Sequence, residues 1–157
     1  KGETKFVEDL KDYLETSHPA TNEVYLLRNL TRSRGVGFYE NHSFYPDFIM
    51  WIKKDGKQII LFVDPKGLTH LGLEDPKLKL HEYLRDQIQP ELGNPNIKLD
   101  AFIVSVTPYR LFTKTHGQSI ALENFAKDKH VLFQYTDAEI QNTSYVERLF
   151  EIATLNA

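Results

Sequence analysis

The stretch YPDFIMWIKKDGKQIILFVDPKG, residues 45–67, contains two apolar segments joined by Asp55-Gly56. Asp-Gly is a strong signal for a two-residue type I′ hairpin turn, because both central residues of that turn need a positive φ. If these two residues form the whole loop, Asp47 at the start of the first strand faces Asp64 near the end of the second. The count of residues alone therefore predicts two neighbouring carboxylates on one face of a sheet.

Two carboxylates about 5 Å apart repel each other by roughly 3 kcal/mol at an effective dielectric of about 20. Relief must come from a proton, a bound cation, or Lys66, which projects to the same face as Asp64 if the strand stays extended. Two carboxylates and the Pro65 carbonyl form a hard oxygen site suited to Mg²⁺. Lys66 is then placed to orient a water or to stabilise charge on a phosphoryl oxygen, as in metal-assisted phosphodiester hydrolysis. The structural alternative is that both aspartates cap strand ends and form ion pairs with Lys66 and a neighbour.

The composition of the 157 residues predicts a single globular domain, with 41% hydrophobic and 26% charged residues. A net charge of −3 argues against a domain that holds nucleic acid by bulk charge alone. The absence of cysteine excludes disulfides, cysteine-based zinc sites and thiol nucleophiles. No P-loop motif is present, so we expect no ATP site in this segment. We find no membrane-span pattern and no signal-peptide pattern, and we expect no membrane partner and a cytoplasmic location.

Hydrophobic periodicity predicts the remaining elements. Helices are expected at 4–15, 75–92, 119–129 and 144–155, and strands at 23–30, 99–107 and 130–136, with Pro108–Gly117 as the longest irregular stretch. The order α-β-β-β-α-β, followed by α-β-α, predicts an α/β fold with a mixed central sheet flanked by helices. Because the chain opens on Lys1 and is in helical pattern by Thr4, we expect residues 1–157 to be a fragment of a longer protein.

Pro-Asp at the start of one strand, followed across a hairpin by Asp-X-Lys, resembles the PD-(D/E)XK nucleases, whose restriction-endonuclease-like core has the same α-β-β-β-α-β order. The blocks LLRN (26–29), RSRGVGFY (32–39), FYPDFIMWI (44–52) and FVDPKG (62–67) are similar to one branch of that family. This branch is the C-terminal endonuclease domain of type III restriction Res subunits, which are helicase–nucleases. The specific part of the resemblance spans residues 23–67. One departure is Pro65, where the family commonly has an apolar residue, so the last hydrogen bond of that strand is in question.

The resemblance implies that Asp47 and Asp64 are metal ligands, with the Pro65 carbonyl as a third, and that Lys66 is the catalytic lysine. It also implies an acidic residue on the first helix that points at the site. Glu3 suits that role better than Glu8, because the centre of the apolar stripe of the helix passes close to Glu3. The alternative for Glu3 is a solvated residue at a frayed helix end.

The predicted function is Mg²⁺-dependent endonucleolytic cleavage of DNA, with Mn²⁺ as a substitute metal. The implied partners are DNA, a helicase/ATPase domain on the same chain, and a methyltransferase (modification) subunit. The arginines that precede the hairpin are candidate phosphate contacts, with a solvated loop as the alternative: Arg28, Arg32 and Arg34. Two rival functions remain open, namely a catalytically silent nucleic-acid-binding or scaffolding module of the same fold and a hydrolase of small phosphoesters.

Overall fold

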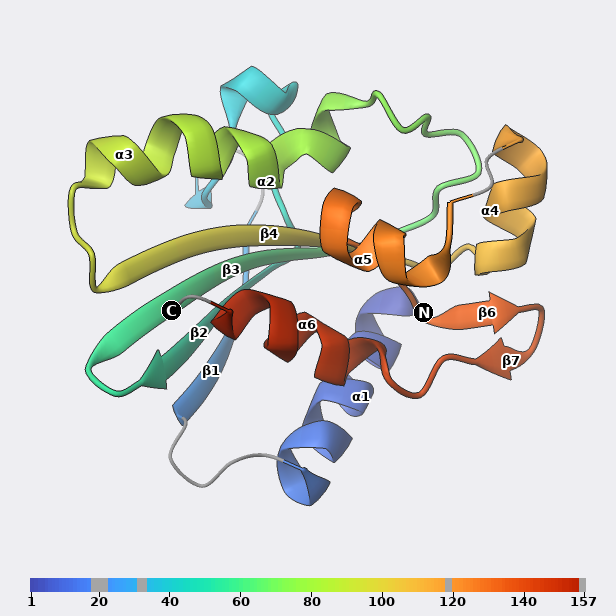
Figure 1. Cartoon of the computed structure of the whole chain (residues 1–157), viewed down its shortest axis with the longest axis horizontal. Helices are drawn as coiled ribbons and strands as arrows, with labels where there is room; N and C mark the ends of the chain where they lie inside the picture. Colours follow the sequence, from blue (N-terminus) through green and yellow to red (C-terminus); the bar gives the residue numbers. More distant parts are fainter. Residues whose placement is uncertain (18–22, 31–33, 118–119, 156–157) are drawn as a thin grey trace.

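The computed structural model describes residues 1–17, 23–30, 34–117 and 120–155, and it has the predicted α/β architecture (Figure 1). A mixed five-stranded sheet has the order β1-β2-β3-β4-β5, with β1–β2–β3 antiparallel and β3–β4–β5 parallel. This arrangement is consistent with a restriction-endonuclease-like core. The strands of this sheet are β1 (Glu23–Arg28), β2 (Phe48–Lys54), β3 (Lys57–Lys66), β4 (Ile97–Ser105) and β5 (Val131–Phe133). The α-helices are α1 (Gly2–Thr16), α2 (Leu80–Tyr83), α3 (Gln89–Leu92), α4 (Tyr109–His116), α5 (Leu122–Lys129) and α6 (Tyr145–Thr154).

The central hairpin has the predicted turn and register. Asp55 and Gly56 both have positive φ, 52° and 77°, as a type I′ turn requires. Lys54 pairs with Lys57 next to the turn, and the ladder continues without a shift to the last pair of β2 and β3, Phe48 with Val63. The next residues along the same register are Asp47 and Asp64.

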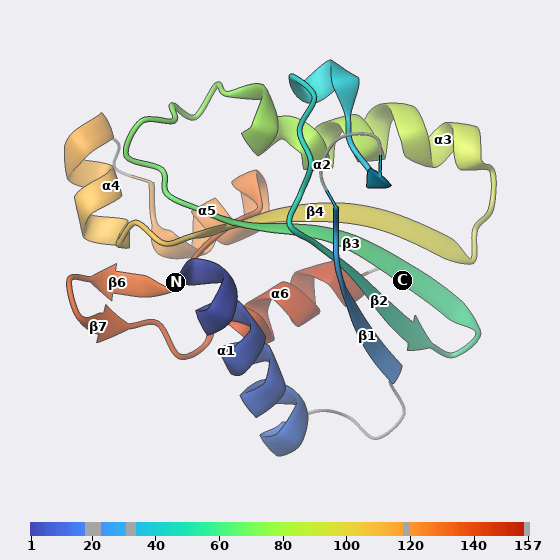
Figure 2. The same ribbon diagram turned by 180° about the vertical axis from the view of Figure 1, so that it is seen from behind.

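Each face of the sheet has its own hydrophobic core, because both alternating sets of side chains on β2 and β3 are apolar. Helices α1 and α6 lie on one face, and the helical run from α2 to α3 lies on the other (Figures 1 and 2). Phe6, Leu61 and Val104 belong to the α1/α6 core. The second core contains Phe112 of α4 and Phe125 of α5.

The helix expected at 75–92 is confirmed in its extent but not in its type, and two other expected elements are wrong. The segment 75–92 is a helical run of changing type, with a 3-10 turn η3 (Pro76–Lys79), α2, a π turn η4 (Leu84–Ile88) and α3. The expected loop at 108–117 is helix α4, with Pro108 as its N-cap and Gly117 in the left-handed conformation at its C-cap. These two residues are start and stop signals of a short helix as well as of a loop.

The expected strand at 130–136 is two strands. Strand β5 ends at Phe133, and β6 (Tyr135–Asp137) pairs with β7 (Ile140–Gln141) in a separate two-stranded sheet. The break is at Gln134, which is 1% exposed and donates its backbone N–H to Ser105 O. A helix long and apolar enough to cross a bilayer is absent from the part of the chain that the structure describes.

We predict that Leu61→Ala lowers the free energy of unfolding by roughly 2–5 kcal/mol, because Leu61 is fully buried in the α1/α6 core. Leu27→Ala is the matched control, since this leucine of β1 is 52% exposed, and its loss should be below about 0.5 kcal/mol. Denaturant unfolding measures both. Equal losses at the two positions would contradict the assignment of the core.

Candidate active site

An acidic cluster forms where the central hairpin ends. It consists of Glu3 in the first turn of α1, Asp47 just before β2, and Asp64 near the end of β3, with Lys66 beside them. The backbone N–H of Asp47 donates to Asp64 Oδ1 at 2.8 Å, and Lys66 Nζ lies 3.4 Å from Asp64 Oδ2. The structure thus brings together all four side chains that the sequence predicted as catalytic.

The positive side chains around the two aspartates compensate their negative charges only in part. Burial, together with the negative charges of Asp64 and Glu3, raises the pKa of Asp47 to about 7, against a smaller opposing effect of Arg28. Burial also raises the pKa of Asp64, although the ammonium of Lys66 opposes this shift. Asp64 is only 4% exposed, so little water screens its charge.

Glu3 reaches the cluster because the first turn of α1 packs closely on the sheet. A Cβ on Gly2 would lie 2.1 Å from Val106 Cγ1, and Gln134 Nε2 donates to Gly2 O at 3.1 Å. A hydrogen bond with Asp47 is the main factor that lowers the pKa of Glu3. Glu8, the alternative candidate, is exposed on the same helix.

Pro65 does not end the strand, since β3 continues to Lys66 and pairs with Ser105 of β4. Lys66 O accepts from Val106 N–H on the β4 side, so the backbone groups of Pro65 face the β2 side. Strand β2 begins only at Phe48, so the β2–β3 ladder does not extend to Pro65. The lack of an N–H on Pro65 therefore costs no hydrogen bond between β2 and β3. The same alternation directs the Pro65 carbonyl toward the side of the strand on which Asp47 lies.

The three candidate arginines have different positions. Arg28 ends β1, where its Nη2 lies 2.7 Å from Glu3 Oε2 and its guanidinium lies over the Phe48 ring. Arg28 thus holds a member of the acidic cluster, and its side chain is still about half exposed. Arg34 is exposed in the loop after β1. Arg32 lies outside the described residues.

Two supports of the cluster were missed in the sequence. Asn29 is buried, its Nδ2 donates to Val36 O and Pro46 O at 2.8 Å, and its Oδ1 accepts from Val36 N–H. Asn29 therefore joins the end of β1 to the Pro46-Asp47 turn, and a single asparagine in a loop carries no periodic signal that reveals this. The second support is Phe44, whose ring lies under the ammonium groups of Lys66 and Lys77, at 5.6 and 6.0 Å.

The donor set fits a hard divalent cation held through few protein ligands. Within the described ranges, no group of three or more histidine, aspartate or glutamate side chains is arranged to hold a metal ion. Asp47, Asp64 and the Pro65 carbonyl supply two carboxylates and one neutral oxygen, which matches the preference of Mg²⁺ for few protein ligands and several retained waters. Burial raises the pKa of both aspartates, and a nearby positive charge would lower it again.

Comparisons with known proteins give two likenesses. Residues 28–93 match the model of the YagJ family, a segment that includes Asp47, Asp64 and Lys66 but not Glu3. A solved structure of an XisH family protein from Nostoc punctiforme PCC 73102 is 15% identical, with coverage of 87% of this chain and 95% of that one. Its TM-score is 0.31. No curated protein matches the chain.

The raised pKa of Asp47 predicts a pH-dependent loss of stability. Between about pH 4 and pH 7 the unfolded chain ionises this carboxyl before the folded chain does, so folding becomes less favourable as pH rises, and the cost is complete above pH 7. Asp47→Asn should raise the free energy of unfolding at pH 8 by on the order of 2 kcal/mol relative to its effect at pH 4.5.

Denaturant titrations at both pH values in the presence of a chelator measure this difference. Asp12→Asn, on the exposed side of α1, is the control and should show no such pH dependence. An effect of Asp47→Asn that is equal at both pH values would contradict the burial-driven shift.

The side chain of Asn29 makes three hydrogen bonds with the backbone of Val36 and Pro46. Asn29→Ala removes all three and leaves buried backbone groups without partners, so it should lower the free energy of unfolding by about 2–3 kcal/mol. Asn124→Ala, at an exposed position of α5, should change it by less than about 0.5 kcal/mol. Thermal unfolding of the two variants decides the point, and an Asn29→Ala protein as stable as wild type would refute it.

Proposed function

We propose that this domain is a divalent-metal-dependent endonuclease that hydrolyses phosphodiester bonds of DNA. The observation that carries the proposal is the meeting of Asp47, Asp64 and Lys66 at one end of the central hairpin. Aspartates that served only as strand caps and ion-pair partners would have lowered pKa values, whereas burial raises the pKa of both. Carboxyls whose pKa is raised at one point of a fold are a mark of a functional site.

Each side chain has a role that follows from its position. Asp47, Asp64 and the Pro65 carbonyl would hold Mg²⁺, or Mn²⁺ in its place, and the bound ion would lower the pKa of a water and polarise a phosphoryl oxygen. Lys66, which remains partly exposed beside Asp64, orients the attacking water or stabilises charge on the phosphoryl oxygen. Glu3 shares a hydrogen bond with Asp47 and so orients that carboxyl.

The context proposed for the domain is the C-terminal part of a cytoplasmic, type III restriction-like Res subunit. The four sequence blocks within residues 26–67 support this assignment, through their similarity to that branch of the PD-(D/E)XK nucleases. Within such a protein, a helicase/ATPase domain would provide most of the binding to DNA, and a methyltransferase subunit would be a further partner. The net charge of −3 agrees with that division, because a domain that cuts but does not hold needs little phosphate neutralisation.

One observation favours a second candidate, a catalytically silent nucleic-acid-binding or scaffolding module of the same fold. Glu3 is held by Arg28, and in the described part of the chain no third acidic or histidine side chain completes a metal-binding group with the two aspartates. Retention of Lys66 next to Asp64 argues for the nuclease, because a silent module has no need of that lysine in a partly buried position.

Incubation of the protein with supercoiled plasmid and Mg²⁺ or Mn²⁺ tests the proposal. Wild type should nick or linearise the plasmid, and Asp64→Asn and Lys66→Ala should each reduce the rate by about 100-fold or more. Asp12→Asn and Lys114→Ala change equivalent charges at exposed positions and should leave the rate unchanged. No cleavage by wild type, or cleavage that survives both active-site substitutions, would overturn the nuclease assignment.

A further inference from the structure

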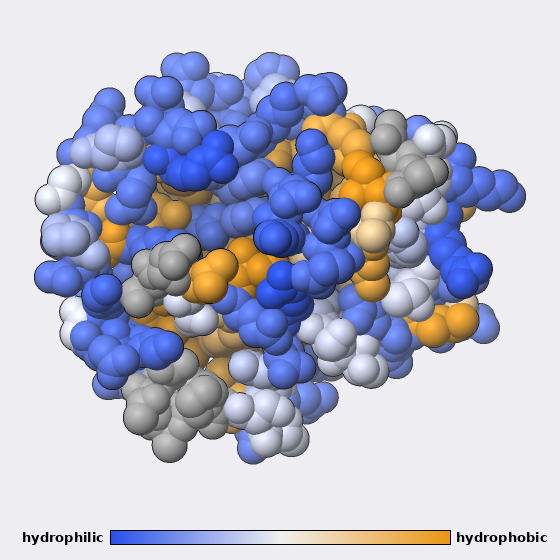
Figure 3. All heavy atoms as spheres, in the orientation of Figure 1, coloured by the Kyte–Doolittle hydropathy of each residue, from blue (hydrophilic) through white to orange (hydrophobic). Residues whose placement is uncertain are grey.

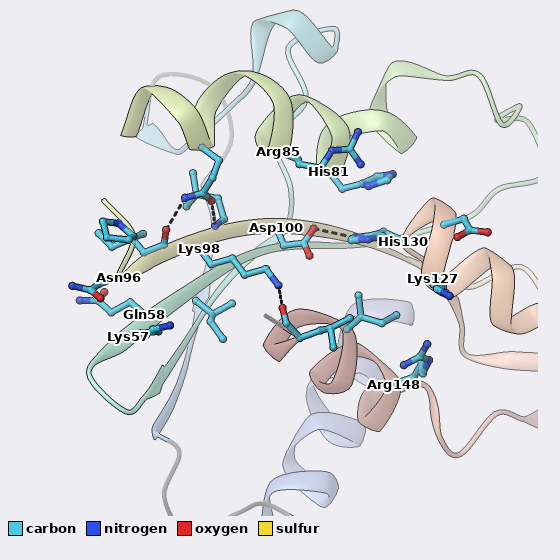
Figure 4. A pocket seen from close by; sticks show the side chains of 18 residues that line it. Lys57, Gln58, His81, Arg85, Asn96, Lys98, Asp100, Lys127, His130 and Arg148 are labelled. Carbon is cyan, nitrogen blue, oxygen red and sulfur yellow. Dashed lines mark hydrogen bonds and ion pairs between the residues drawn. The ribbon is translucent and has the colours of Figure 1, made fainter. Parts of the chain in front are cut away.

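A cavity of about 580 Å³ lies beside β4, at the end of β3 opposite to the acidic cluster (Figure 4). Its positive side chains do not meet at one point. The guanidinium groups of Arg85 and Arg148 are paired with neighbouring carboxylates, and Lys57 and Lys127 lie at opposite ends of the cavity. The space-filling view shows apolar atoms among hydrophilic side chains on this face (Figure 3). Positive charge that a ligand could use lies instead beside the acidic cluster.

Arg28, Lys66 and Lys77 are positively charged side chains whose charges act on the acidic cluster. Two of them already contact a carboxylate: Arg28 Nη2 lies 2.7 Å from Glu3 Oε2, and Lys66 Nζ lies 3.4 Å from Asp64 Oδ2. Within the described ranges, no carboxylate lies within ion-pair distance of the Lys77 ammonium group. Of these three side chains, Lys77 is therefore the one whose charge remains available to a substrate.

A shared aromatic ring places Lys77 near Lys66. The centre of the Phe44 ring lies 5.6 Å from Lys66 Nζ and 6.0 Å from Lys77 Nζ, and Phe44 is only 5% exposed, so the ring is a fixed support. Burial raises the pKa of Asp64, and the charges of Lys66 and, less strongly, Lys77 oppose this shift. Two ammonium groups at one ring repel each other, and an anion that contacts both would offset the repulsion.

The backbone that carries Lys77 is fixed on the second core. Lys77 is the second residue of η3, and its N–H donates to the Asp75 carboxylate at 2.9 Å. Asn41 Nδ2 donates to Pro76 O at 2.7 Å, and the next residue, Leu78, is buried among apolar side chains. The position of Lys77 relative to the acidic cluster is thus set before any substrate arrives, while its side chain is still partly exposed.

Lys79 lies in the same turn and carries the same charge, but its contacts differ. Its Nζ donates to Glu74 Oε2 at 2.6 Å, so a carboxylate already neutralises it. The side chain of Lys79 is thus directed to Glu74, whereas that of Lys77 is directed to the Phe44 ring. Lys79 is therefore a matched control for the charge of Lys77.

We propose that Lys77 binds a phosphate of the DNA backbone next to the phosphate at which cleavage occurs. This inference rests on the proposed function, in which the metal ligands and Lys66 act on the phosphodiester that is hydrolysed. Lys77 holds a neighbouring phosphate of the same strand, and such contacts position the backbone without reading its sequence. The substrate class that follows is a polynucleotide with at least two consecutive phosphates, and not a small ester with a single phosphate.

Anisotropy of a fluorescein-labelled DNA duplex, titrated with the whole chain in Ca²⁺ in place of Mg²⁺, tests this proposal. Lys77→Gln should weaken binding by about threefold to tenfold at about 50 mM salt. It should also reduce the slope of log Kd against log salt by about 0.9, the value for one lost phosphate contact. Glutamine keeps much of the aliphatic stem beside Phe44, so the fold is retained.

Two further variants control this measurement. Lys79→Gln removes the same charge from the same turn and should change neither the affinity nor the slope. Lys77→Arg keeps the charge and should behave as wild type does. In the plasmid assay with Mg²⁺, Lys77→Gln should raise KM by a similar factor and leave kcat within about twofold, because Lys77 holds the substrate and does not contact the reacting atoms.

The proposal is overturned if Lys77→Gln and Lys79→Gln have equal salt slopes, if Lys77→Gln lowers kcat as strongly as Lys66→Ala does, or if wild type does not bind the duplex at low salt. Wild type that binds the duplex but does not cut the plasmid would overturn the nuclease assignment alone. The salt slopes of the Lys77 and Lys79 variants would still decide whether Lys77 contacts a phosphate.

Discussion

The hydrogen bond from the Asp47 backbone to the Asp64 carboxylate is the contact on which the candidate active site depends. It extends the β2–β3 ladder by one step beyond Phe48 and Val63, at the point where regular pairing ends. The type I′ turn at Asp55-Gly56 sets this register eight residues away, and an added residue in the turn would separate the two aspartates. The chemistry at one end of the hairpin is thus determined by backbone geometry at the other.

The negative charges of the acidic cluster are only partly compensated by positive side chains of this chain. Arg28 neutralises Glu3, and Lys66 offsets part of the charge of Asp64, while Asp47 is left with a pKa near 7. The burial of Asp47 and Asp64 would be unfavourable in a purely structural site. Apolar neighbours on β2 and β3 and the hydrogen bonds of Asn29 maintain it. A divalent cation bound at this place would offset the negative charge of the two aspartates.

The β3–β4 pair has a different feature at each end. The acidic cluster lies where β3 ends, and a cavity of about 580 Å³ lies where β3 and β4 begin, beside an unpaired strand edge. The short length of β5 creates the pocket, and Gln89, Asp100 and His130 close the backbone edge so that it does not recruit another strand. The acidic cluster and this cavity share no residue.

The sequence by itself determined the hairpin, the mixed sheet and the proximity of Asp47, Asp64 and Lys66, because turn chemistry and strand alternation are local rules with a fixed period. It also favoured Glu3 over Glu8, through the helical wheel of α1. Tertiary structure alone decided the break at Gln134, the anchoring role of Asn29 and the pairing of Arg28 with Glu3. It also decided the cavity beside β4, whose lining residues come from separate segments between Lys57 and Leu155. Those features depend on contacts between elements that are distant in the sequence. The periodic pattern of residues within one helix or strand does not specify such contacts.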